Sequence, residues 1–265
     1  MTGVRRFEDK AVIVTGASSN PGIGRACALR LAQEGASLVV NARSADALEE
    51  TADAARAQGS AVVTVVGSMT DDAIHGQLVD AALTHFGRLD GVVQTVGGAP
   101  HQVPVRELTQ HDIVDTVVLN VWPSVALAQE AARRGLTAGG AIVTISSGSP
   151  GKTTVTMGAY AAAKAALNQL TRTLAADLAR SGIRVNAVSP GLTRTTVTQP
   201  VWEADGGVAA GKRLPLGRIT EAEDIAAAVA FLLSEDAASI TGVLLDVDAG
   251  NHLDSGWSAY AEPAG

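Results

Sequence analysis

The sequence predicts an α/β fold: a doubly wound, seven-stranded parallel sheet with helices on both faces. Two observations predict it. Short runs of β-branched and other apolar residues alternate with longer helical patterns along the whole chain. Most of the short runs are apolar throughout, as expected of strands that are buried on both faces of a parallel sheet. Such alternation is typical of Rossmann-like folds, in which right-handed crossovers connect the strands.

Seven runs are expected to form the strands, and six segments between them to form the helices. The expected strands are residues 11–15, 37–41, 61–66, 91–95, 141–146, 184–188 and 243–247. The expected helices are residues 23–34, 45–58, 71–86, 109–132, 159–179 and 221–233. Thr220 and Glu223 have the spacing of a capping box, so we expect them to begin the last helix.

The chain reads as one domain over residues 1–265, with two segments that lack this rhythm. Residues 192–215 are polar, contain Trp202 and show no clear period. Because a connection of this length inside a compact domain is usually functional, we expect a lid over a site. The tail from residue 251, with Trp257 and Tyr260, is also irregular. Packing on a neighbouring subunit and fraying are both left open for this tail.

Composition and charge exclude several classes of protein. The 265 residues are 46% hydrophobic and 18% charged, which is typical of a globular protein. A net charge of -7 argues against nucleic acid as a partner. No signal peptide is evident at the start, and no apolar run approaches the roughly 20 residues of a membrane span. A single cysteine, Cys27, excludes an internal disulfide, so a soluble cytoplasmic protein without membrane association is expected.

A glycine-rich segment lies between the first strand and the first helix. Residues 15–24 read Thr-Gly-Ala-Ser-Ser-Asn-Pro-Gly-Ile-Gly. Such a turn exposes backbone N–H groups at a helix N-terminus, where they attract phosphate, and glycines leave room for it. A purely structural turn is the alternative. The position in the first strand-turn-helix unit favours dinucleotide binding.

The end of the second strand bears on which dinucleotide binds. An NAD site commonly has an Asp or Glu there, which hydrogen-bonds the ribose 2′-hydroxyl. This chain has Val-Asn-Ala-Arg-Ser at residues 40–44, with no acid and with Arg43. A guanidinium pairs with a 2′-phosphate, which a carboxylate would repel. The prediction is NADP(H), against the alternative that Arg43 is a solvated surface residue.

Tyr160 and Lys164 are four residues apart on an expected helix, so their side chains share one face. A tyrosine hydroxyl with a pKa of about 10 is a poor acid or base near neutrality. A neighbouring ammonium group favours the phenolate and is expected to lower that pKa. Alone this spacing is common by chance on surface helices.

Together these residues resemble the short-chain dehydrogenase/reductase family in its compact single-domain form, over residues 10 to about 251. The glycine motif of the family matches residues 16–24, and its Tyr-x-x-x-Lys motif matches Tyr160 and Lys164. Its serine after the fifth strand matches Ser147, and its asparagine on the fourth helix matches Asn120. Its Pro-Gly segment after the sixth strand matches residues 189–195, and its closing strand matches residues 240–250. Any one match is weak, but the ordered set is highly specific.

The resemblance implies a role for each matched residue. Tyr160 would be the general acid and base, and Lys164 would lower its pKa and hydrogen-bond the nicotinamide ribose. Ser147 would hydrogen-bond the substrate oxygen, and Asn120 would hold a water that connects Lys164 to solvent. The implied cofactor-binding residues are Gly16, Ser18, Ser19, Gly22, Ile23, Arg43, Ser68, Met69, Thr95, Gly97, Tyr160, Lys164, Pro190, Gly191, Thr193 and Thr195.

The chain also departs from the family pattern. The glycine loop has two residues more than usual, Asn20 and Pro21, and Pro21 would stiffen the turn by restricting φ. Residues 94–97 read Gln-Thr-Val-Gly where the family usually has Asn-Asn-Ala-Gly. Ser68 and Met69 stand where an Asp is usual. These changes affect the adenine side of the cofactor site and leave the proton-transfer residues unchanged.

The expected function is an NADP(H)-dependent oxidoreductase that interconverts a ketone and a secondary alcohol. The substrate is left open between a 3-oxoacyl thioester, as for 3-oxoacyl-carrier-protein reductases, and a secondary-metabolite ketone. Arg133 and Arg134 are candidates for contact with an acidic carrier protein, although a solvated helix end is the simpler interpretation. The resemblance implies a homo-oligomer, a dimer or tetramer formed through the fourth and fifth helices. No catalytic metal is expected.

Two other functions were weighed. A non-catalytic cofactor-sensing or scaffold protein of the same fold usually lacks the tyrosine or lysine, which this chain retains. An epimerase or dehydratase of the extended branch needs a larger C-terminal substrate domain.

Overall fold

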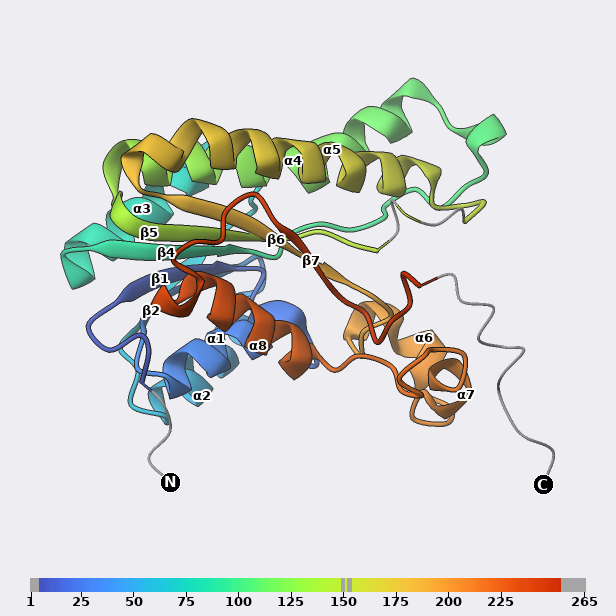
Figure 1. Cartoon of the computed structure of the whole chain (residues 1–265), viewed down its shortest axis with the longest axis horizontal. Helices are drawn as coiled ribbons and strands as arrows, with labels where there is room; N and C mark the ends of the chain where they lie inside the picture. The colour runs from blue at the N-terminus through green and yellow to red at the C-terminus, as the bar shows by residue number, and fades with distance from the viewer. Residues whose placement is uncertain (1–4, 149–150, 152–153, 254–265) are drawn as a thin grey trace.

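One parallel sheet organises the molecule. The computed structural model describes residues 5–148, 151 and 154–253. Its sheet has the order β3-β2-β1-β4-β5-β6-β7, and every pairing is parallel, which confirms the predicted fold class (Figure 1). The strands are β1 Ala11–Thr15, β2 Ser37–Ala42, β3 Val62–Val66, β4 Leu89–Gln94, β5 Leu136–Ile145, β6 Arg184–Pro190 and β7 Leu244–Val247.

Helices cover both faces of this sheet. One layer contains α1 Ile23–Gln33, α2 Ala45–Arg56 and α8 Ala222–Leu233, and the other contains α3 Asp72–Phe86, α4 Gln110–Arg134 and α5 Gly158–Leu178 (Figure 1). Short 3₁₀ turns lie at η1 Val105–Glu107, η3 Ala179–Ser181 and η5 Glu235–Ala237.

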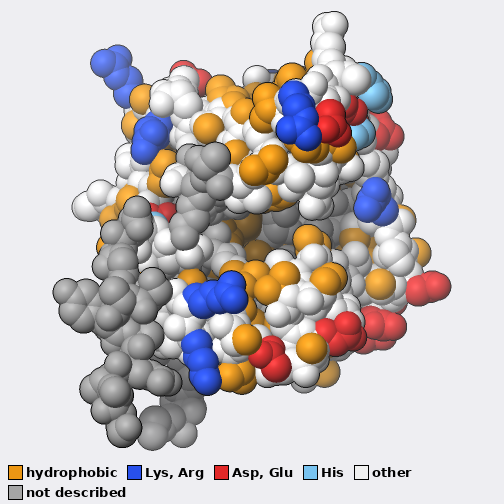
Figure 2. Space-filling model, turned by 90° about the vertical axis from the view of Figure 1, so that its right-hand side faces the viewer, with side chains coloured by type: hydrophobic (Ala, Val, Ile, Leu, Met, Phe, Trp, Pro, Cys, Tyr) orange, Lys and Arg blue, Asp and Glu red, His pale blue; other side chains and the backbone are white. Residues whose placement is uncertain are grey.

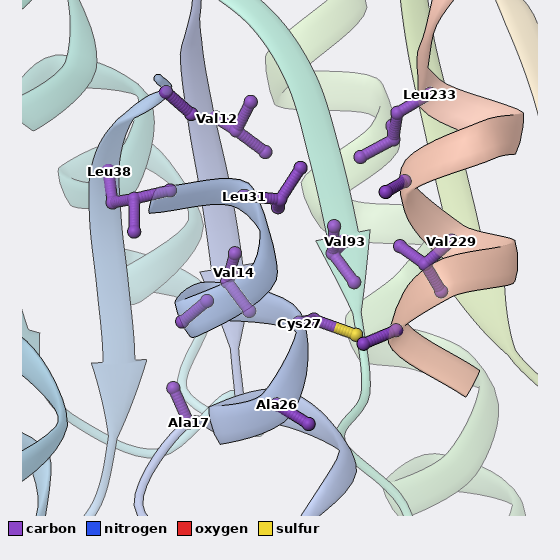
Figure 3. Close-up of a cluster of buried hydrophobic side chains, with 14 of the residues drawn as sticks. Val12, Val14, Ala17, Ala26, Cys27, Leu31, Leu38, Val93, Val229 and Leu233 are labelled. Carbon is purple, nitrogen blue, oxygen red and sulfur yellow. The ribbon is translucent and has the colours of Figure 1, made fainter. Parts of the chain in front are cut away.

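The alternation of side chains across β1 explains its uninterrupted apolar sequence. Val12 and Val14 point into the core beneath α1 and α8, whereas Ile13 points into the core beneath α3 and α4. Figure 3 shows the first of these cores, where Cys27 on α1 and Val229 on α8 approach Val93 of β4. Both faces of β1 are therefore buried.

The start of the last helix differs from the expected Thr220–Glu223 capping box. The N-cap is Glu221, whose backbone N–H donates to the Asp224 carboxylate over 2.9 Å. Arg218 also binds Asp224, at 2.6 Å, and so strengthens this arrangement. Thr220 instead forms a parallel bridge with Thr193, one residue before the N-cap.

Two strands begin earlier than expected. β4 starts at Leu89 and β5 at Leu136, because these two residues pair with each other ahead of a shift in register. Apolar runs alone did not indicate this extension, since residues 137–139 of β5 are exposed.

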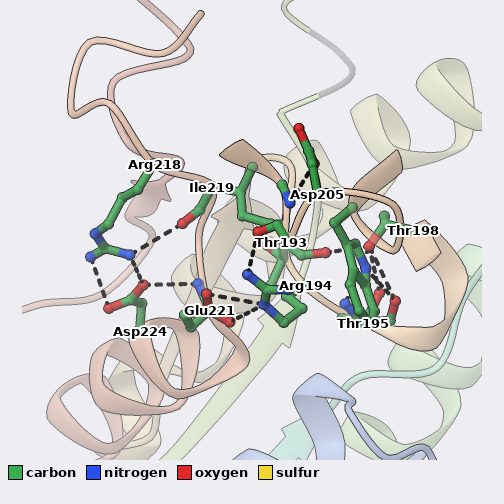
Figure 4. A network of polar contacts seen from close by, with 12 residues as sticks. Thr193, Arg194, Thr195, Thr198, Asp205, Arg218, Ile219, Glu221 and Asp224 are labelled. Atoms are coloured by element: carbon green, nitrogen blue, oxygen red, sulfur yellow. Dashed lines mark hydrogen bonds and ion pairs between the residues drawn. The ribbon is translucent and has the colours of Figure 1, made fainter. Parts of the chain in front are cut away.

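The expected lid is more ordered than its sequence indicates. It contains η4 Thr196–Thr198 and two four-residue helices, α6 Gln199–Trp202 and α7 Val208–Gly211, which are too short to produce a period. Arg194 holds the segment together: its guanidinium lies 4.9 Å from the Trp202 ring centre and binds Glu221 and the Gly206 carbonyl oxygen (Figure 4). Trp257 and Tyr260 of the tail lie outside the described residues.

None of the described helices is both long enough and apolar enough to cross a bilayer.

Candidate active site

The candidate site lies where the carboxyl ends of the strands meet, at the edge from which β6 leads into the lid. Figure 2 shows this edge with a hollow between the upper part of the molecule, which carries α4 and α5, and the lower part, which carries α6 and α7. Hydrophobic side chains lie on both lips of the hollow. In doubly wound sheets ligands bind at this edge, near the point where the strand order reverses, here between β1 and β4.

The glycine loop forms a cradle that side chains would fill. Gly16 has φ of +65°, and a Cβ there would lie 2.5 Å from Thr95 Oγ1. A Cβ on Gly22 would lie 2.5 Å from the Ser19 carbonyl oxygen. The N-cap of α1 is Gly22, which provides no side-chain cap, and the first turn of the helix contains no acidic residue. Its first N–H groups therefore remain available to an anion, which fits the pyrophosphate of a dinucleotide.

The two additional residues of this loop reach the lid. The carbonyl oxygen of Pro21 accepts a hydrogen bond from Thr196 N at 3.0 Å. The peptide bond between Asn20 and Pro21 is cis. Ser18 and Ile23 are partly exposed, Ser19 is exposed and Gly22 is buried.

A threonine on α2, which sequence analysis missed, supports the loop. The Thr51 hydroxyl is buried and donates to the Ala17 carbonyl oxygen over 2.7 Å. Arg25 donates to the same hydroxyl over 2.8 Å. No motif marks Thr51, because its partner lies 34 residues away in the chain.

The residues expected on the adenine side of the cofactor lie at the ends of β2 and β3. Arg43 directly follows β2, is exposed and forms no ion pair with the other described residues. Asn41 donates to the carbonyl oxygens of Val65 and Gly67, which ties the two strand ends together. Ser68 is hydrogen-bonded to Thr70 near the surface. The Met69 side chain lies in the core, so only its backbone is available to a ligand.

The structure brings Ser147, Tyr160 and Lys164 together. Ser147 follows β5 and hydrogen-bonds the side chain of Tyr160, which is in the first turn of α5. Lys164 lies one turn further, with its Nζ 5.8 Å from the Tyr160 ring centre. Its ammonium donates to the Ile145 carbonyl oxygen over 2.9 Å at the end of β5.

Burial dominates the pKa of both groups. It lowers the pKa of Lys164 from 10.5 to about 8, because the side chain is only 3% exposed. Burial also raises the pKa of Tyr160, while the hydrogen bond to Ser147 opposes this rise. The expected lowering of the Tyr160 pKa by Lys164 is therefore wrong for the protein without cofactor. Removal of each side chain from water is the largest cause of its shift.

Asn120 connects α4 to the loop after β4. Its side chain accepts from Gly98 N and donates to the carbonyl oxygens of Gly98 and Thr116, at 3.0, 2.7 and 2.8 Å. Gly97 lies between Asn120 and Lys164: a Cβ on it would be 2.6 Å from Asn120 Oδ1 and 2.9 Å from Lys164 Nζ. The two polar atoms thus border the same small space. Thr95 anchors the start of this loop through a 2.6 Å hydrogen bond to the Thr15 carbonyl oxygen.

The segment after β6 closes the site on the remaining side. Gly148 N donates to the Pro190 carbonyl oxygen over 3.0 Å, which holds the residue after Ser147 against β6. A Cβ on Gly191 would collide with Asp248, which directly follows β7, so only glycine fits at this position. The buried Thr193 hydroxyl donates to the Gly191 carbonyl oxygen, and the Thr195 hydroxyl contacts that of Thr198.

Arg133 and Arg134 lie far from this site along α4. Helix α4 runs from the carboxyl end of β4 back to the start of β5, so its last turn is at the opposite edge of the sheet. Arg133 binds Glu130, and Arg134 binds both Glu130 and Asp80. Among the described residues, no group of three or more His, Cys, Asp or Glu side chains is arranged to hold a metal ion.

Comparison with known proteins decides the family. A family model described as enoyl-(acyl carrier protein) reductase matches residues 16–252. A cis-4-hydroxycyclohexanecarboxylate dehydrogenase from Sinomonas cyclohexanicum is 37% identical over 248 residues, which are 92% of this chain and 97% of that protein. A short-chain dehydrogenase from Burkholderia cenocepacia J2315 in complex with NADP superposes with a TM-score of 0.84 at 34% identity, covering 92% of this chain and 98% of the other. The chain belongs to the short-chain dehydrogenase/reductase family.

A levodione reductase structure is also similar to this short-chain dehydrogenase/reductase, with a TM-score of 0.86 and 30% identity over 94% of this chain and all of that one. Membership makes the protein an oxidoreductase that uses a nicotinamide cofactor. The glycine cradle and the uncapped N-terminus of α1 fit such a cofactor.

Proposed function

We propose that the chain is an NADP(H)-dependent reductase of a ketone, and in the reverse direction a dehydrogenase of a secondary alcohol. The observation that carries this proposal is the contact between Ser147 and Tyr160, with Lys164 one helical turn behind, at the sheet edge that also holds the glycine cradle. A proposed proton donor, its proposed oxyanion partner and the glycine cradle thus lie at one edge of the sheet, where Figure 2 shows a hollow.

In the reductive direction Tyr160 donates its proton to the carbonyl oxygen while the carbon is reduced. When bound, NADPH would supply the hydride. Ser147 hydrogen-bonds the same oxygen and stabilises the negative charge that develops on it. Tyr160 is protonated in the cofactor-free protein, because burial raises its pKa, and it therefore starts as the acid that reduction needs.

Lys164 and Asn120 are proposed to renew the proton. Lys164 is held by the Ile145 carbonyl oxygen, and its pKa of about 8 allows it to gain and lose a proton near neutrality. Asn120 Oδ1 and Lys164 Nζ lie within 2.6 and 2.9 Å of the same point beside Gly97, so they are close enough to each other for one water to bridge them. A proton can then pass from solvent to Lys164 and on to Tyr160.

The proposed preference for NADP(H) rests on Arg43. Its guanidinium at the end of β2 forms no ion pair with another described residue and is suited to a 2′-phosphate. The NADP complex of the Burkholderia relative supports this choice. Two similar proteins are named for cyclic compounds, the cyclohexanecarboxylate dehydrogenase and the levodione reductase, which favours a ketone over an acyl thioester.

We also propose that the protein is a cytoplasmic homo-oligomer. Val114, Val118 and Trp122 are four residues apart on α4 and are all exposed, so they form one apolar stripe. A second copy would bury this stripe. Light scattering of the purified protein and of the Val118→Lys variant tests this proposal.

The proposed chemistry is tested with Tyr160→Phe. We expect the variant to bind NADPH with an affinity within about threefold of the parent, because the ring remains, and to lose at least about a thousandfold in kcat. NADPH fluorescence measures the first quantity, and consumption of NADPH with a panel of ketones the second. Retained turnover would refute the mechanism. Cofactor binding without turnover of any ketone by the parent protein would favour the sensing or scaffold alternative.

A further inference from the structure

The exposed large hydrophobic residues of this protein are distributed unevenly. Among the described residues, they lie on α4 or on segments at the carboxyl edge of the sheet, and none lies in the turns at the opposite edge. Exposed apolar side chains that are grouped together mark a surface that binds something apolar. The stripe on α4 was assigned above to a second copy, so the remaining group concerns the candidate active site.

Three separate segments around Tyr160 each present a valine. Val105 lies in η1, after β4, and is 65% exposed. Val155 lies in the turn that precedes α5 and is 68% exposed. Val197 lies in η4, after β6, and is 84% exposed. The segments that follow three adjacent strands, β4, β5 and β6, therefore each carry one uncovered apolar side chain at the edge of the sheet where the candidate site lies.

One contact, one hydrogen bond and the order of the chain place the segments that carry these valines near the candidate site. A Cβ on Gly158 would lie 2.7 Å from Val105 Cγ2, so Val105 packs on the first turn of α5, two residues before Tyr160. Val155 is five residues before Tyr160 in the same strand-to-helix connection. The hydrogen bond from Thr196 to Pro21 holds η4, and with it Val197, beside the glycine cradle.

Among the described residues near these valines, the arginines Arg106 and Arg194 both have partners within the protein. Arg106 forms an ion pair with Glu107 at 3.3 Å. Arg194 lies on the Trp202 ring and binds Glu221. Both arginines therefore already have protein partners. A carboxylate or phosphate on the substrate would have to displace one of these partners, or would lie against a valine side chain.

We propose that the natural substrate is a neutral, largely hydrocarbon ketone, and that Val105, Val155 and Val197 select it. This inference rests on the proposed function and names the substrate class of the same site. A charged group brought against these side chains would lose its hydration without gaining a partner. A ring or branched hydrocarbon beside the carbonyl would instead cover apolar surface that is open to water in the free protein.

The test compares two ketones that differ in one group. 4-Methylcyclohexanone and 4-oxocyclohexanecarboxylate share the ring and the carbonyl, and one carries a methyl where the other carries a carboxylate. With NADPH, we expect kcat/KM to be at least about tenfold higher for the methyl compound. The acetoacetyl thioester of N-acetylcysteamine, which represents acyl thioesters, should be no better than the carboxylate.

The role of Val105, Val155 and Val197, called here the valine wall, is tested at Val105 with a matched pair of variants. Val105→Lys places a cation in the wall and should shift the ratio of the two kcat/KM values toward the carboxylate by about tenfold or more. Val105→Gln has a similar length without charge and should not favour the carboxylate. The ratio is unaffected by general damage to the enzyme, which would lower both values together.

The outcomes separate the inference from the function on which it rests. Preference for the carboxylate or the thioester by the parent protein would overturn the substrate class while leaving the ketone reductase intact. If Val105→Lys changed kcat/KM equally for both ketones, Val105 would not contribute to the selection. Absence of turnover with all three compounds, with NADPH still bound, would overturn both proposals.

Discussion

The backbone N–H of Thr196 donates a 3.0 Å hydrogen bond to the carbonyl oxygen of Pro21, and so joins the lid to the glycine loop. Pro21 belongs to the two residues by which this loop exceeds the usual length in the family. The insertion therefore has a structural partner, and the lid is attached to the turn that is proposed to hold the pyrophosphate. A cofactor bound at the glycine loop would therefore bind a segment whose position is coupled to η4.

Thr196→Pro should weaken NADPH binding by about fivefold, the equivalent of one hydrogen bond of about 1 kcal/mol. Proline is tolerated at the first position of a helical turn, so the substitution removes the donor with little effect on η4. Thr196→Ala keeps the N–H and is the control, with an expected dissociation constant close to that of the parent. NADPH fluorescence titration measures all three proteins. Equal weakening in both variants would show that the side chain matters and the hydrogen bond does not.

Gly97→Ala should abolish most of the turnover while leaving the protein folded. Its Cβ would lie 2.6 Å from Asn120 Oδ1 and 2.9 Å from Lys164 Nζ, so one or both groups must move. We expect kcat to fall by at least about a hundredfold, because proton transfer depends on their positions. Gly98→Ala is the matched control, since its Cβ would meet only Leu119 Cδ2, at an ordinary 3.9 Å. Similar kcat values for the two variants would argue against a role for this space.

Arg43→Asp should reverse the cofactor preference. The carboxylate would repel the 2′-phosphate and offer an acceptor to the 2′-hydroxyl. We expect kcat/KM for NADPH to fall by about a hundredfold and that for NADH to rise or stay constant. Arg43 is exposed at the end of β2 and pairs with no other described residue, so the fold should not change. A parallel loss with both cofactors would contradict the assignment.

Lys164→Met should stabilise the cofactor-free protein at pH 7 and remove its activity. The pKa of Lys164 lies near 8 in the folded protein and near 10.5 when unfolded. The cost of burying its charge is then about 3 kcal/mol below pH 8, offset in the variant by about 1 kcal/mol for the hydrogen bond lost at Ile145. Urea unfolding measures the expected net gain of about 2 kcal/mol.

The pH dependence of that gain provides the control. Because the unfolded chain holds more protons than the folded protein between about pH 8 and 10.5, the parent should gain stability as the pH rises through this window. The difference from Lys164→Met should shrink accordingly. A difference that does not vary with pH would mean that packing, and not the buried charge, separates the two proteins.

Much of the fold was predictable from periodicity. The order of strands and helices, the parallel sheet and the helix that carries Tyr160 and Lys164 agree with the structure, because these features depend on local patterns of apolar residues. The beginning of α8 was mispredicted by one residue, because Asp224 completes a capping box with Glu221 while Thr220 is paired with Thr193, a long-range contact. The two short lid helices were missed because four residues do not establish a period.

The sequence by itself determined the family, the arrangement of the sheet and the candidates Ser147, Tyr160 and Lys164, since each follows from local spacing and order. Only the tertiary structure decided how these groups behave. Burial sets the pKa of Tyr160 and Lys164, and it results from packing of the whole sheet edge. The contact of Thr196 with Pro21 joins residues far apart in the chain, which no local pattern encodes.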